Sequence, residues 1–96
     1  MNLEKMFDKH DEEYLKFDRI ENPPHNRPDL CAFILLDKLS PSERARDIIA
    51  CSEHDEFWID ASPEDVANNA TEEDIIYLQR CGIRYDSSND SFCMFS

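Results

Sequence analysis

The stretch IRYDSSNDSFCMF, residues 83–95, indicates most directly which class of fold the chain adopts. Segments 83–86 and 91–95 are rich in aromatic and other strand-forming residues. Between them lies DSSND, whose small polar residues favour turns. The pattern predicts a β-hairpin with a loop of four or five residues.

A third strand is predicted earlier in the chain, at EFWID, residues 56–60. In a strand, Phe57 and Ile59 share one face, whereas Trp58 shares the other face with Glu56 and Asp60. We expect the face with Phe57 and Ile59 to meet the core. Trp58 is then covered by the first helix, which is the favoured interpretation, or it faces outward as an interface anchor.

Helical patterns occupy the first half of the chain. In residues 3–17, apolar side chains recur at the helical period and charged side chains fill the other face. The segment PDLCAFILLDKL, residues 28–39, begins with a proline that suits the first helical turn. Apolar side chains surround this second helix from Leu30 to Leu36, so we expect it at the centre of the core.

Three capping sequences predict further helices. Ser or Thr precedes Glu or Asp by three residues at 40–43, 62–65 and 71–74, as in a capping box. The first sequence is expected to open a helix that runs to about Ala50. The last is expected to open a helix that Gly82 ends.

Together these elements predict an α+β fold in a single domain, residues 1–96. Two or three N-terminal helices would pack on a small antiparallel sheet, with strands near 56–60, 83–86 and 91–95. One or two short helices would be inserted between the strands.

Composition argues against several functional classes. Gly82 is the only glycine, so phosphate-binding loops and dinucleotide fingerprints, which need several glycines, are not expected, nor is any cofactor. The net charge of −12 opposes direct binding to nucleic acid or to anionic membranes. The N-terminal residues contain no apolar signal segment, and no apolar run is long enough to span a bilayer. The expected location is therefore the cytoplasm.

The segment CSEHDEFWID, residues 51–60, raises the question of a metal site or a catalytic cluster. Cys51 and His54 have ligand-like spacing, but a second pair of ligands at similar spacing is missing. The same two residues could form a thiolate–imidazole pair with Asp55 nearby, although no glycine turn accompanies them. A metal- or thiol-dependent enzyme centred on Cys51 and His54 is therefore one alternative, and no catalytic residue is assigned.

The distribution of charge favours a different function. From Asp47 to Gln79 the chain has ten acidic residues and no Lys or Arg. One explanation is that several acids lie in first helical turns, where the helix dipole favours them, and that the others serve solubility. The other is an acidic surface that docks on a basic protein. The candidate residues for that surface are Glu53, Asp55, Glu56, Trp58, Asp60, Glu64, Asp65, Glu72 and Glu73.

Four segments carry a resemblance to known proteins: RPDLCAFILLDKL, SEHDE, ATEED and RCGIRYD. They resemble a family of small acidic proteins encoded in phage and prophage genomes, and the resemblance spans roughly residues 14–95. That family has no assigned activity, so the resemblance implies no site residues. It implies a small, non-structural phage protein in the cytoplasm of a bacterial host. Binding to a host factor is then expected by analogy, because small phage proteins of this kind often bind host factors.

The sequence therefore predicts a small acidic, non-enzymatic interaction protein that docks on a basic host protein. Host proteins that themselves bind nucleic acid are one candidate class of partner, because clustered carboxylates imitate part of the field of DNA. A structural protein or a homodimer is a further alternative, in which Trp58 and the hairpin edge bury against a second copy.

Overall fold

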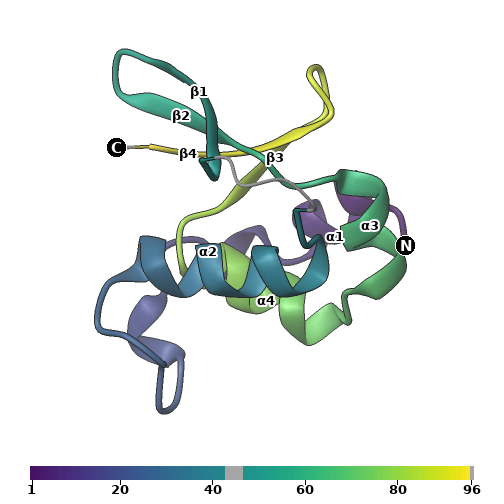
Figure 1. Cartoon of the computed structure of the whole chain (residues 1–96). Helices are drawn as coiled ribbons and strands as arrows, with labels where there is room; N and C mark the ends of the chain where they lie inside the picture. Colours follow the sequence, from purple (N-terminus) through teal and green to yellow (C-terminus); the bar gives the residue numbers. More distant parts are fainter. Residues whose placement is uncertain (43–46, 96) are drawn as a thin grey trace.

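The chain folds into helices and an antiparallel sheet of four strands in the computed structural model, which describes residues 1–42 and 47–95 (Figure 1). The helices lie on one side of the sheet (Figure 1). The predicted α+β class is therefore confirmed. Within these residues, every helix is too short or too polar to cross a lipid bilayer.

The first helix is shorter than predicted. α1 comprises Leu3–Lys9, and two 3-10 turns follow it, η1 (Asp11–Glu13) and η2 (Phe17–Arg19). Leu15, between the two turns, has a φ of 62°, in the left-handed region. A right-handed helix cannot continue through such a residue. The prediction of one helix over 3–17 is therefore wrong beyond the end of α1.

α2 (Pro28–Leu39) has the predicted bounds, but it does not lie at the centre of the core. Leu30 and Ile34, one turn apart, are 38% and 55% exposed. The helix therefore packs against the rest of the protein by one face, and the expectation of burial on all sides is wrong. Its buried side chains are Cys31, Ala32, Leu36 and Leu39.

The predicted capping box at the start of α4 (Glu72–Arg80) is confirmed. The Thr71 hydroxyl accepts a hydrogen bond from the Asp74 backbone N–H at 3.2 Å, and the Asp74 carboxylate accepts one from the Thr71 N–H at 2.9 Å. These two bonds satisfy donors that an uncapped helix leaves unpaired. Gly82 follows the helix with a φ of 96°, as expected for a glycine that ends a helix.

The other two capping sequences have different outcomes. Ser62 caps α3 (Pro63–Asn69) as predicted. The helix predicted after Ser40 falls partly on residues 43–46, which lie outside the described residues. Its predicted end belongs instead to strand β1 (Ile49–Glu53), so the helix prediction is wrong there. The isoleucine that begins the strand is β-branched and favours extended backbone, and pairing with the next strand fixes it.

The sheet has the order β1-β2-β4-β3, and each neighbouring pair is antiparallel. Three strands match the prediction: β2 (Glu56–Ile59), β3 (Arg84–Asp86) and β4 (Ser91–Phe95). The predicted hairpin joins β3 to β4, whereas β1 was not predicted. β2 lies between β1 and β4, so the strand that carries Trp58 occupies the middle of the sheet.

Aromatic side chains join the helices to the inner face of the sheet, which is the face toward the helices. Phe92 of β4 is fully buried, and its ring centre lies 6.1 Å from that of Phe7 in α1 and 5.8 Å from that of Tyr85. Phe57 of β2 meets Phe33 of α2 edge to face at 6.1 Å. Ile59 is 3% exposed. The predicted inward direction of Phe57 and Ile59 is therefore confirmed.

Candidate functional site: the outer face of the sheet

Cross-strand pairing gathers a defined set of side chains on the side of the sheet opposite the helices, which we call the outer face. Directly paired residues of an antiparallel sheet point to the same side. Trp58 pairs with Cys51 on one neighbouring strand and with Cys93 on the other, and Cys93 pairs in turn with Arg84. The same register gives the whole outer face: Cys51, Glu53, Glu56, Trp58, Arg84, Asp86, Ser91, Cys93 and Phe95.

In the part of the chain that the structure describes, no helix lies over the outer face (Figure 1). α1 does not cover Trp58, contrary to the favoured interpretation, because α1 packs on the inner face through Phe7. Trp58 is half-buried by its neighbours in the sheet, and Phe95 is 52% exposed. The outer face is therefore an open surface that carries two aromatic side chains.

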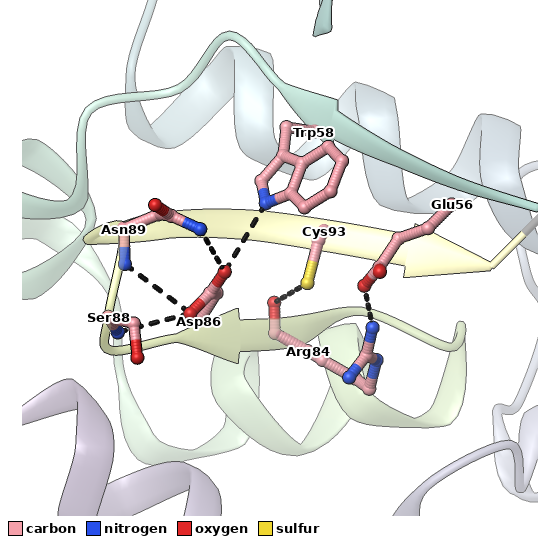
Figure 2. Close-up of polar contacts among 7 residues, drawn as sticks. All are labelled: Glu56, Trp58, Arg84, Asp86, Ser88, Asn89 and Cys93. Atoms are coloured by element: carbon pink, nitrogen blue, oxygen red, sulfur yellow. Dashed lines mark hydrogen bonds and ion pairs between the residues drawn. The ribbon is translucent and has the colours of Figure 1, made fainter. Parts of the chain in front are cut away.

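Arg84 organises one half of the outer face (Figure 2). Its guanidinium carbon lies 4.1 Å from the centre of the Phe95 ring, a cation–π distance. Its Nη2 also forms an ion pair with Glu56 Oε1. Cys93 lies on β4, which runs between β2 and β3. It is 1% exposed, and burial raises the pKa of its thiol. The Cys93 side chain is therefore a neutral packing group, since a reactive cysteine needs its thiolate form.

Asp86 organises the other half of the outer face (Figure 2). Its carboxylate accepts hydrogen bonds from the Asn89 side-chain amide at 2.6 Å and from the Ser88 backbone N–H at 3.0 Å. The Trp58 indole N–H makes a longer contact with the same carboxylate, at 3.5 Å. These hydrogen bonds lower the pKa of Asp86, and the bond from the Asn89 side chain has the largest effect. An ionised Asp86 thus ties Trp58 to the loop between β3 and β4.

A shallow depression of about 400 Å³ opens beside Trp58. Its walls come from the edge strand β1, from β2 and from the end of the β3–β4 loop. A small hollow with an aromatic wall on an open surface is a typical place for a side chain of a partner protein to bind. The lining residues are Ala50, Cys51, Glu53, Trp58, Asn89 and Ser91.

Glu53 and Asp55 lie at the tip of the β1–β2 hairpin, and both side chains are exposed. Glu53 pairs across the hairpin with Glu56, and like charges in directly opposed positions repel each other. Arg84 compensates the charge of Glu56. Among the described residues, no basic side chain pairs with Glu53. The hairpin tip therefore brings the exposed Glu53 and Asp55 carboxylates next to the depression.

The candidate acids that follow the sheet lie at the starts of two helices. Glu64 and Asp65 are in the first turn of α3, and Glu72 and Glu73 are in the first turn of α4. All four side chains are exposed. The starts of both helices are well separated from the β1–β2 hairpin tip (Figure 1). The structure therefore places Glu53, Asp55, Glu56 and Trp58 together and leaves these four acids elsewhere.

Among the described residues, two of the candidate acids form ion pairs with basic side chains that lie outside residues 47–79. Glu56 pairs with Arg84, and Glu72 pairs with Lys9 at 2.8 Å and with His10 at 2.7 Å. The Lys9 and His10 contacts lower the pKa of Glu72. Asp60, just after β2, is half-buried, and its backbone N–H donates to the Ile48 carbonyl at 2.6 Å. Folding therefore compensates part of the charge that the sequence concentrates in this segment.

Cys51 and His54 do not form a recognisable reactive centre. Cys51 lies on exposed strand β1, and His54 occupies the hairpin turn with a φ of 48°. Within residues 1–42 and 47–95, no three or more His, Cys, Asp or Glu side chains form a group that could hold a metal ion. No hydrogen bond joins Cys51 to His54 there either. The enzyme alternative thus gains no further residue from the structure.

Sequence reasoning missed Arg84, Asp86 and Phe95 as members of the site. Strand alternation alone places Arg84 with Asp86, and Cys93 with Phe95, on common faces of the predicted hairpin. Asp86 also begins DSSND, a position where Asp commonly bonds to its own turn. The sequence does not show that β2 pairs with β4, and this pairing is what brings Trp58 to them.

Comparisons with protein-family models, with curated proteins and with solved structures found no match.

Proposed function

We propose that this chain is a non-enzymatic interaction protein that docks on a basic surface of a partner protein through the outer face of its sheet. The observation that carries this proposal is the open outer face with Trp58 and Phe95. Aromatic side chains that are partly exposed at the middle of a surface are the usual anchors of protein interfaces. Trp58 is also held in place by its neighbours, so little conformational entropy is lost when a partner covers it.

Charge indicates the kind of partner. The net charge of −12 attracts basic surfaces over a distance and repels a second copy of the chain. Glu53 and Asp55 bring exposed carboxylates to the edge of the outer face. As part of the same proposal, the partner is a protein of a bacterial host cell, which rests only on the resemblance to small acidic phage and prophage proteins.

The test compares two pairs of charge reversals. Glu53→Lys with Asp55→Lys changes the hairpin tip, and Glu64→Lys with Glu73→Lys changes the net charge equally at the two helix starts. Tagged wild type and both variants capture proteins from bacterial lysate at about 0.1 M and 0.5 M salt, where screening lengths differ more than twofold. Circular dichroism verifies that the variants are folded.

We expect the wild type and the helix variant to retain a basic protein at low salt. The hairpin variant should lose it, and so should the wild type at high salt, because screened surface charges attract weakly. Equal retention by both variants, or capture that is insensitive to salt, would contradict docking through the outer face. A wild type that sediments as a stable dimer and captures nothing would instead support the homodimer alternative.

A further inference from the structure

The geometry points to the depression beside Trp58 as a binding slot for one arginine side chain of the partner. This inference deepens the proposed function and rests on it. The guanidinium group would stack on the Trp58 indole and pair with the Glu53 carboxylate. Three independent features of the described residues carry it.

The first feature is an internal example of the same arrangement on the same face. The Arg84 guanidinium lies over the Phe95 ring, at 4.1 Å from guanidinium carbon to ring centre, and pairs with Glu56. An aromatic ring, a carboxylate and a guanidinium group thus already form one complete set. Trp58 and Glu53 offer a second ring and a second carboxylate around the depression, and among residues 1–42 and 47–95 no basic side chain lines it or pairs with Glu53.

The second feature is the electrostatics of the hairpin end. Glu53 and Glu56 are directly opposed cross-strand partners, so their like charges repel each other. Arg84 relieves this repulsion on the side of Glu56 only. A cation beside Glu53 would relieve it on the other side. A positively charged group is therefore a better occupant of the depression than an apolar or acidic one.

The third feature is the aromatic wall. Tryptophan is the strongest cation–π partner among the aromatic residues, and arginine uses this contact more often than lysine. A planar guanidinium can stack on a ring and bond to a carboxylate at the same time. Trp58 is held by Asp86 at the side of the depression, which keeps the indole in position before a ligand arrives. Arginine is therefore the expected side chain.

The probe is the capped tripeptide acetyl-Gly-Arg-Gly-amide, titrated into reduced protein at constant ionic strength and followed by NMR. The Trp58 indole resonance is a direct reporter, because the chain has only one tryptophan. We expect saturable shifts at that indole and at the amides of β1. The matching Gly-Lys-Gly peptide should bind more weakly, since ammonium stacks less well on an indole.

Variants locate the slot. Trp58→Leu, which keeps an apolar side chain but removes the ring, should weaken binding of the arginine peptide about three- to fivefold. Glu53→Gln should weaken it about threefold. Asp55 lies in the same hairpin but does not line the depression. Asp55→Asn should therefore leave the affinity for the arginine peptide unchanged, although it removes the same charge as Glu53→Gln. Amide spectra establish that each variant is folded.

Several results would overturn the slot. They are the absence of saturable shifts at Trp58, equal binding of the lysine peptide, or equal effects of Glu53→Gln and Asp55→Asn. If the arginine peptide fails in this way but a basic partner still depends on the hairpin acids, the slot is wrong and the docking proposal stands. If the peptide binds as expected but no basic partner is captured, the slot stands and the docking proposal fails.

Discussion

Replacing Gly82 with alanine should destabilise the fold by about 1 kcal/mol. Gly82 has a φ of 96°, and an L-residue in the left-handed region costs about 1–2 kcal/mol. Alanine also restricts the unfolded chain, which offsets about 0.4–1 kcal/mol of this cost. The new methyl group would lie 3.1 Å from Leu15 Cδ2 and 3.4 Å from Met94 Cε. Both atoms end flexible side chains, so we expect them to move aside and backbone strain to dominate.

The assay is urea unfolding at pH 7, followed by far-UV circular dichroism. Gly82→Ala should lower the urea midpoint without changing the slope, and it should lower the Tm by about 4–8 °C. Gly82→Asn should lose less stability, because asparagine tolerates left-handed backbone better than alanine does.

A double-mutant cycle with Leu15→Ala separates the two sources of destabilisation. If backbone strain dominates, Gly82→Ala costs the same free energy of unfolding with and without the Leu15 side chain. A loss that disappears in the Leu15→Ala background would assign the cost to crowding instead. An unchanged midpoint for Gly82→Ala alone would refute the positive φ at this position.

Three further predictions concern stability. Thr71→Ala should cost about 1 kcal/mol in urea unfolding, because it removes the cap of α4, while Thr71→Ser should keep most of that stability. Burial raises the pKa of the Cys81 thiol from its ordinary 9.0 to about 12. The neutral Cys81 thiol therefore contributes its full stability to the fold below pH 9, and this stability is lost as the pH rises from 9 toward 12. That loss should reach about 1 kcal/mol near pH 10, and Cys81→Ala should flatten the alkaline pH dependence. The Arg80 and Arg19 contacts lower the pKa of Glu13. The ionised Glu13 carboxylate therefore stabilises the fold at neutral pH, and this stabilisation is lost as the pH falls below about 4. Glu13→Gln should make the free energy of unfolding depend less steeply on pH in acid.

Elements with a strong local signal were predictable from the sequence. α2 has its proline at the predicted start, and the capping box of α4 forms between Thr71 and Asp74. The hairpin of β3 and β4 follows from two strand-like segments around DSSND. In each case the residues that decide the structure lie within a few positions of one another, so no knowledge of the tertiary fold is needed.

Elements that depend on distant partners were not predictable. β1 is exposed along its whole length, and its sequence does not alternate apolar and polar residues as the sequence of a half-buried strand does. Within the described residues, β1 is held in the sheet by its pairing with β2 alone. The exposure of Ile34 depends on which side of α2 the sheet occupies. Charge compensation of Glu56 by Arg84 also joins residues far apart in the chain. The sequence therefore predicted Trp58 and the hairpin acids as members of the candidate site, but it grouped them with four acids at helix starts that lie elsewhere. It missed Arg84 and Asp86.

The most direct test of docking through the outer face is amide chemical-shift mapping of the labelled chain with the basic protein that it captures. We predict that the largest shifts occur around Glu53, Trp58 and Phe95, together with broadening of the Trp58 indole signal. The exposed Leu30 and Ile34 on α2 provide an internal comparison, because they form the other exposed apolar pair considered above. Shifts centred on α2, with the Trp58 indole unchanged, would contradict the proposed function.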